Sequence, residues 1–174
     1  MRTFQKETSL FRNWRMDTPE DLEICAELDF KYWKVPRICK DESDLKLCEE
    51  YVIKYYSPLK EIYITLISDD EYPNIGWMPF VNFCKTCQIV DKVCNMSVVD
   101  RAFIATNVEL EDMDENPDRA LQRFEFIEIL FRLAAAKYKD TKKVSTFHEA
   151  FEKLVHENIF KHFVPEPWQS FREE

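Results

Sequence analysis

The chain has a single glycine, Gly76, among its 174 residues. Ordinary proteins contain about 7% glycine, which would be roughly a dozen residues in a chain of this length. Because glycine takes positive φ at little steric cost, a chain this poor in it has few positions for tight hairpins or phosphate-cradling loops. The sequence therefore predicts an all-α fold, and it excludes the glycine-rich nucleotide-binding motifs.

Charge and hydropathy narrow the class of protein further. The formal net charge is −9 and the isoelectric point is near 5.0, whereas nucleic-acid binding proteins carry a basic footprint. No apolar run approaches the roughly 20 residues of a membrane span. We therefore expect that the chain does not bind nucleic acid and does not span a membrane. Its expected partners are other proteins. The six cysteines, without a secretory signal, are typical of a reduced, cytoplasmic protein, and the basic N-terminus leaves a mitochondrial location open.

Helical periodicity and punctuation divide the chain into four segments. We expect an N-terminal arm, two N-terminal helices, a helix–loop–helix pair, and a long C-terminal helix with an extended tail, over residues 1–16, 17–57, 58–138 and 139–174 respectively. Thr18 and Thr146 precede apolar stripes and are expected to be N-caps, as are Ser43 and Ser97. Ser57–Pro58 is expected to end or kink one helix and to open the next.

The stretch Asp114–Glu125 has the ligand spacing of a calcium-binding loop. Oxygen ligands fall at positions 1, 3, 5, 7 and 12 of a twelve-residue window, where they are Asp114, Asn116, Asp118, the Ala120 carbonyl and Glu125. Two residues depart from the pattern. Arg119 stands where the loop needs glycine, and Pro117 holds φ near −65° where such loops take positive φ. We therefore favour a solvated acidic loop over a calcium site, and keep calcium as the alternative.

This loop and its flanking helices resemble an EF-hand, and residues 58–90 resemble residues 98–138. Ile75 and Leu121 take position 8 of the two loops, each five residues before a phenylalanine. The resemblance implies a divergent EF-hand pair in which these two residues form a short β-bridge. In the first loop, positions 1, 3, 5 and 12 are Ser68, Asp70, Tyr72 and Pro79. Because only Asp70 suits a hard cation, no calcium is expected there.

Phe103–Asn107 and Arg123–Glu128 are loosely similar to EF-hand-like segments of ciliary and cytoskeletal proteins. This resemblance implies a non-catalytic interaction or structural module of a larger assembly, with a cytoskeletal or ciliary location and no cofactor. Partners would bind through a helical groove and through aromatic anchors near the two ends of the sequence, at Phe4, Phe11, Trp14, Trp168 and Phe171. The alternatives are a calcium sensor or buffer using loop 114–125, and a subunit of a mitochondrial or other large complex.

A third alternative is a zinc or thiol site at Cys84-x-x-Cys87, with Cys94 as the candidate third ligand. No fourth ligand completes this set, so we favour two small apolar side chains on one helix face. The three histidines, at 148, 156 and 162, are expected at the surface or an interface. Since the sequence shows no arrangement of nucleophile and base, we do not expect an enzyme.

Overall fold

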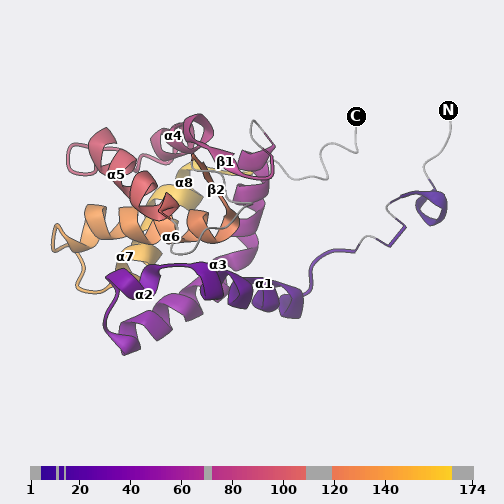
Figure 1. The fold of residues 1–174 in the computed structure, drawn as a ribbon, viewed down its shortest axis with the longest axis horizontal. Helices are drawn as coiled ribbons and strands as arrows, with labels where there is room; N and C mark the ends of the chain where they lie inside the picture. The colour runs from indigo at the N-terminus through magenta and orange to yellow at the C-terminus, as the bar shows by residue number, and fades with distance from the viewer. Residues whose placement is uncertain (1–4, 11, 14, 69–71, 109–118, 166–174) are drawn as a thin grey trace.

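The computed structural model describes residues 5–10, 12–13, 15–68, 72–108 and 119–165. Its helices are α1 (Pro19–Tyr32), α2 (Val35–Ile38), α3 (Glu42–Ile67), α4 (Trp77–Thr86), α5 (Met96–Asn107), α6 (Arg123–Ala134), α7 (Phe147–Leu154) and α8 (Phe160–His162) (Figure 1). The 3₁₀ turn η1 (Lys6–Thr8) precedes them, and the π-helical turns η2 (Ala135–Lys139) and η3 (Val155–Ile159) extend α6 and α7. The all-α prediction is confirmed.

The predicted β-bridge is present. The strands β1 (Ile75–Gly76) and β2 (Ala120–Leu121) pair antiparallel, with Ile75 opposite Leu121 and Gly76 opposite Ala120. The two helix–loop–helix units, α3–β1–α4 and α5–β2–α6, are therefore joined at the position-8 residues of their loops. Gly76 itself has φ of −69°, so the bridge does not use its conformational freedom. Among the described residues, positive φ falls on Gln88 and Lys142 instead.

The helix starts are partly as predicted. Thr18 caps α1 and Thr146 caps α7, each in a reciprocal capping box. The prediction for Ser43 is wrong, because Asp41 caps α3 by accepting hydrogen bonds from the backbone of Ser43 and Asp44. Ser97 is likewise not a cap, since Asn95 caps α5. In both cases a carboxylate or amide two residues earlier serves as the acceptor.

The helix expected to end or kink at Ser57–Pro58 does not end there, because α3 continues as one α-helix from Glu42 to Ile67 with Pro58 inside it, and its ribbon changes direction along its length (Figure 1). An interior proline costs about 3 kcal/mol, because it removes one backbone hydrogen bond and crowds the preceding turn. Buried side chains flank it on both sides, with Tyr56 and Leu59 each 1% exposed. Burial of this apolar face offsets the local cost.

The core lies where α7 packs against both α3 and α6. Phe131 of α6 stacks on Phe151 of α7, with ring centroids 4.1 Å apart and planes 7° apart. Phe83 of α4 meets Phe126 of α6 edge-on at 5.7 Å, which joins the two helix–loop–helix units. The C-terminal helix thus covers one face of the pair, and α1 packs against α3 and α6 elsewhere on the molecule (Figure 1).

Candidate functional site

The first loop is held by the protein itself. Tyr63 of α3 donates its hydroxyl to the carbonyl of Pro73 at 2.7 Å. Ser68 bonds back to Thr65 at the end of α3, and Pro79 lies within α4. Asp70 lies outside the described residues. The first loop therefore shows no calcium ligand set among its described residues.

The second loop is described only at its end. Of the five calcium candidates, Asp114, Asn116 and Asp118 lie outside the described residues, whereas Ala120 lies in β2 and Glu125 in α6. Glu125 is 2% exposed, and its Oε2 accepts the backbone N–H of Gln122 at 2.8 Å. This contact closes the N-terminal turn of α6. The solvated acidic loop therefore stays a prediction, with calcium binding as its alternative.

A buried lysine fixes the helix that enters the second loop. Lys34 lies between α1 and α2, and its side-chain ammonium donates to the carbonyls of Thr106 and, at 2.6 Å, Val108. These carbonyls end α5, where the helix dipole favours a cation. Lys34 is 8% exposed, so little water competes for the contact.

The same lysine reaches the helix that leaves the loop. Its ammonium lies 3.7 Å from Oε2 of Glu128 on α6, and its backbone N–H donates to the other oxygen of that carboxylate. Arg132 supplies a second cation, with its Nε 3.3 Å from Glu128. Burial raises the pKa of Glu128 above its usual range, although both cations oppose that rise. We call this group, with the carbonyls of Thr106 and Val108, the Lys34 clamp.

A second group fixes the start of α6. Asp29 of α1 is 4% exposed and forms a bidentate ion pair with Arg123, in which the Nε–Oδ2 and Nη2–Oδ1 distances are both 2.9 Å. Tyr56 of α3 donates its hydroxyl to the same carboxylate at 2.6 Å. Burial raises the pKa of Tyr56, and the hydrogen bond to Asp29 adds to the rise. We call Asp29, Tyr56 and Arg123 the Asp29 clamp.

The two clamps hold both ends of the second loop. The Lys34 clamp fixes the end of α5 and the middle of α6, and the Asp29 clamp fixes the first residue of α6. Charged side chains from outside the loop therefore contribute to how α5 and α6 are placed relative to each other. Sequence reasoning missed both clamps, because each joins residues 94 positions apart with no local pattern to mark them.

The C-terminal helix is tied to the first unit as well. Asn158 of η3 donates its amide to the carbonyls of Cys87 and Gln88, at 3.1 and 3.0 Å, just beyond α4. Its Oδ1 accepts the hydroxyl of Tyr138 in η2. With the Phe131–Phe151 stack, these contacts keep the face covered by α7 closed to a partner.

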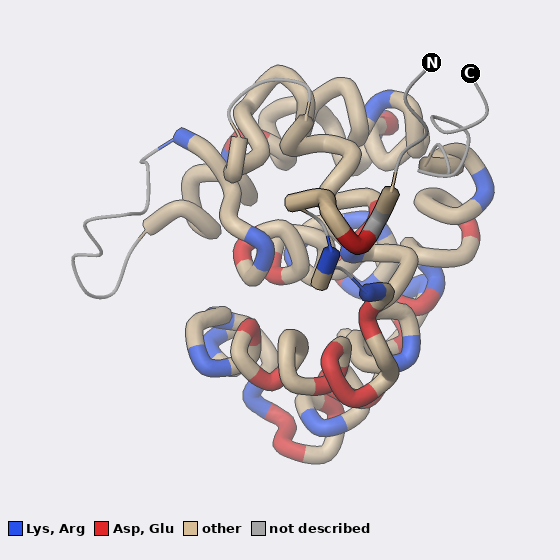
Figure 2. Tube along the Cα trace, turned by 90° about the vertical axis from the view of Figure 1, so that its right-hand side faces the viewer, with Lys and Arg blue, Asp and Glu red and all other residues tan. Residues whose placement is uncertain are grey.

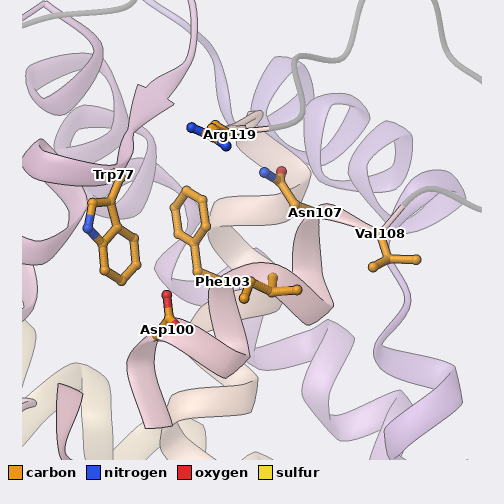
Figure 3. A pocket seen from close by; sticks show the side chains of 7 residues that line it. Trp77, Asp100, Phe103, Asn107, Val108 and Arg119 are labelled. Atoms are coloured by element: carbon orange, nitrogen blue, oxygen red, sulfur yellow. The ribbon is translucent and has the colours of Figure 1, made fainter. Parts of the chain in front are cut away.

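A pocket of about 700 Å³ opens beside α5 (Figure 3). Its described lining combines apolar, amide and charged side chains, namely Trp77, Asp100, Phe103, Ile104, Asn107, Val108 and Arg119. Trp77 meets Phe103 edge-on at 5.0 Å. Ile104 and Val108 are 57% and 56% exposed. The side-chain nitrogen and oxygen of Asn107 are buried and have no hydrogen-bond partner in the described structure.

Among the described elements that line the pocket, the helices α4 and α5 carry few charges. α4 has one charged residue, Lys85, and α5 has two, Asp100 and Arg101, whereas α1 is rich in acids (Figure 2). Charge-poor surface with an aromatic floor is typical of protein interfaces. The predicted aromatic anchors all lie outside the described residues; they are Phe4, Phe11, Trp14, Trp168 and Phe171. Within the described helices, none combines the length and apolar character needed to cross a membrane.

The cysteines of the Cys-x-x-Cys motif are buried in the core. Cys84, Cys87 and Cys94 are each 0% exposed. Burial raises the pKa of Cys87 to about 12 and that of Cys94 to about 11. These thiols pack in the hydrophobic core as small apolar groups, which agrees with the interpretation favoured from the sequence. Of the histidines, His148 is not a free surface residue, because its ring bonds Asp44 and stacks on Tyr51.

Two helix–loop–helix units joined through the position-8 residues of their loops define an EF-hand pair. The family model described as the EF-hand of tubulin polyglutamylase TTLL11 matches residues 54–164, which is more than half of the chain. The chain belongs to this EF-hand family, and the predicted resemblance is confirmed. No curated protein and no solved structure matches the chain. Asp29 and Lys34, which anchor the two clamps, precede the matched segment.

Proposed function

We propose that the chain is a non-catalytic protein-interaction module, an EF-hand pair of static shape that serves a larger assembly of the tubulin cytoskeleton. The observation that carries this proposal is the pair of clamps at the second loop. They hold α5 and α6 through Lys34, which contacts the end of α5 and Glu128, and through Arg123, which contacts Asp29. The family supports the cytoskeletal part, because the matching model is named for a tubulin-modifying protein.

The pocket beside α5 is the surface we propose for the partner. Its occupant is a peptide segment of another protein that places an apolar side chain against Trp77 and Phe103 and pairs a backbone amide with Asn107. The net charge of −9 disfavours an acidic partner surface. A ciliary assembly is the narrower form of this proposal.

Proximity labelling in cells tests the surface. Ile104→Glu places a charge in the pocket, and Ile64→Glu on α3 is the matched control, since the two isoleucines are 57% and 52% exposed. We expect cytoskeletal neighbours labelled by the wild-type chain to be lost with Ile104→Glu and kept with Ile64→Glu. Identical labelling by all three chains would remove the pocket from the proposal.

Calcium calorimetry separates the static module from the calcium sensor. We expect no heat of binding at millimolar calcium, because the clamps already hold α5 and α6 and because Arg119 and Pro117 disfavour the loop conformation. A binding heat that Glu125→Gln abolishes would sink the static interpretation and establish the sensor. Circular dichroism of the variant checks its fold, since Glu125 also caps α6.

A further inference from the structure

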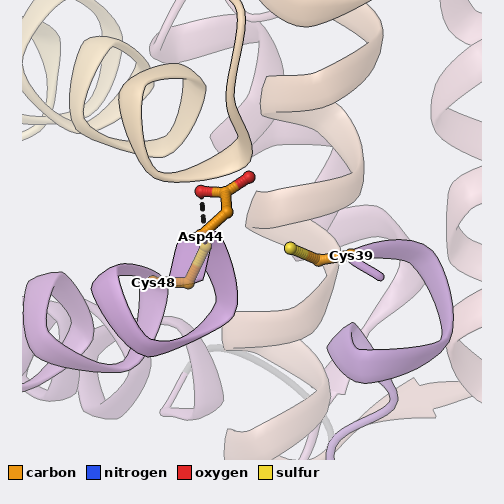
Figure 4. A group of neighbouring side chains, drawn as sticks. All are labelled: Cys39, Asp44 and Cys48. Atoms are coloured by element: carbon orange, nitrogen blue, oxygen red, sulfur yellow. Dashed lines mark hydrogen bonds between the residues drawn. The ribbon is translucent and has the colours of Figure 1, made fainter. Parts of the chain in front are cut away.

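Three potential metal ligands meet where α2, α3 and α7 come together (Figure 4). They are the thiols of Cys39 and Cys48 and the carboxylate of Asp44, and one ligand atom from each lies within 4.8 Å of the other two. Their residues are 2%, 0% and 7% exposed. In the described part of the chain no other group of three such side chains comes this close.

Local structure explains the convergence. Asp44 and Cys48 are four residues apart on α3, so they lie on one face of the helix, one turn apart. Cys39 ends α2, and the turn at Asp41 folds it back against that face. The two cysteines are nine positions apart, so the pair lacks the short Cys-x-x-Cys spacing by which sequence reasoning finds zinc sites.

The carboxylate is held in place by the start of α7. Oδ2 of Asp44 accepts the backbone N–H of Phe147 at 2.8 Å, and Oδ1 accepts that of His148 at 3.1 Å. The Nδ1 of His148 also lies 2.7 Å from Oδ1. Metal-binding carboxylates are themselves commonly oriented by such outer hydrogen bonds. Asp44 therefore needs little reorganisation to face a cation beside the two sulfurs.

The thiols are protonated in the metal-free protein. Burial raises the pKa of Cys39 to about 11 and that of Cys48 further, and the nearby Asp44 carboxylate adds to both. Cys48 donates its thiol proton to Asp44 at 3.8 Å. A dication replaces these two protons and releases them to solvent. Two thiolates and one carboxylate with a dication carry a net charge of −1, the same as the metal-free group with its two protonated thiols and one carboxylate.

We propose that Cys39, Asp44 and Cys48 bind a zinc ion. Two thiolates select a soft or borderline metal over calcium and magnesium, which take oxygen ligands. A tetrahedral zinc ion would need a fourth ligand, for which a water molecule would serve. His148 is a positioning residue that orients Asp44. Because Asp44 also holds the first turn of α7, zinc bound here links α2 and α3 to the C-terminal helix that closes the EF-hand face.

Metal titration of the whole chain under reducing conditions tests this site. Cobalt(II) is added first, because thiolate ligation produces a charge-transfer absorption, and zinc then displaces it in competition with a chromophoric chelator. We expect one equivalent of zinc and a thiolate–cobalt band. Both are expected to vanish in Cys39→Ser and Cys48→Ser. His148→Gln is expected to weaken binding about 10–100-fold, as loss of an outer-shell partner does.

The matched controls are Cys25→Ser, which removes a partly exposed thiol, and Cys87→Ser, which alters the Cys-x-x-Cys motif. Both are expected to keep the equivalent of zinc. Absence of stoichiometric metal in the folded wild-type chain overturns the proposal, and this outcome does not depend on whether a variant folds. The proposal is also overturned if Cys39→Ser binds zinc with full affinity, or if Cys87→Ser is the one variant that loses zinc binding.

Discussion

Replacement of Lys34 by methionine tests the Lys34 clamp directly. Methionine keeps an unbranched apolar stem in the site and removes the ammonium. The carbonyls of Thr106 and Val108 then lose their donor, and Glu128, which is 0% exposed, keeps Arg132 as its remaining cation. We therefore expect Lys34→Met to lower the free energy of unfolding strongly.

The magnitude follows from the burial of both partners. Removing one member of a buried ion pair typically costs about 3–5 kcal/mol, because the other charge is left uncompensated. Hydrogen bonds from a charged donor contribute about 1.5–3 kcal/mol each. With Arg132 retained, we expect about 3 kcal/mol for Lys34→Met. For a chain of this size that corresponds to a fall in melting temperature of roughly 6–12 °C.

Urea unfolding followed by circular dichroism measures this loss. The matched control is Lys153→Met, since Lys153 pairs with Glu157 on a solvated helix face where such a pair contributes about 0.3–0.5 kcal/mol. The double variant Lys34→Met/Glu128→Gln removes the orphaned charge and is expected to lose less than the two single losses summed. A loss below about 1 kcal/mol for Lys34→Met, or strict additivity, would refute the clamp.

Other contacts give further expectations. In urea unfolding we expect a loss of about 2–5 kcal/mol for Leu121→Ala and about 3–5 kcal/mol for Phe151→Ala, because both side chains are 0% exposed. The control Ile64→Ala, at 52% exposure, is expected to lose under 1 kcal/mol. Equal losses in all three variants would contradict the assigned core. For Asp44, burial opposes ionisation, but bonds from Phe147 and His148 outweigh it and lower its pKa. Its ionised form therefore stabilises the fold above the unfolded pKa of about 3.9, and this stability is lost as pH falls through the lower folded pKa. We expect the stability difference between wild type and Asp44→Asn to shrink from pH 6 to pH 3, and a difference independent of pH would contradict this.

The parts of this fold that sequence reasoning predicted are those with local causes. Thr18 and Thr146 cap helices three residues ahead of an acidic partner, so the signal lies within one turn. Ile75 and Leu121 were placed opposite each other by their position in two similar loops. The prediction that Ser43 caps α3 was wrong, because Asp41, two residues earlier, is the hydrogen-bond acceptor. A run of polar residues does not show which of them is the N-cap.

The parts that could not be predicted depend on distant residues. Pro58 ends helices by local rules, yet the buried face around it keeps α3 continuous. Lys34 and Glu128 have no shared motif, and neither do Asp44 and His148, which meet only where α7 packs on α3. Buried charges and thiols carry little signal in a single sequence, because the same residue types also occur on solvated surfaces.

The unbroken helix α3 bears on how much chain forms the folding unit. Its 26 residues form one continuous helix whose ribbon bends along its length (Figure 1), and the family segment begins at residue 54, inside that helix. A fragment cut at this boundary loses Asp29, Lys34 and Asp44 together, and with them every anchor that α1 and the start of α3 provide to α6 and α7. We therefore expect a stably folded fragment to begin at least as early as α1, ahead of the segment shared with the family.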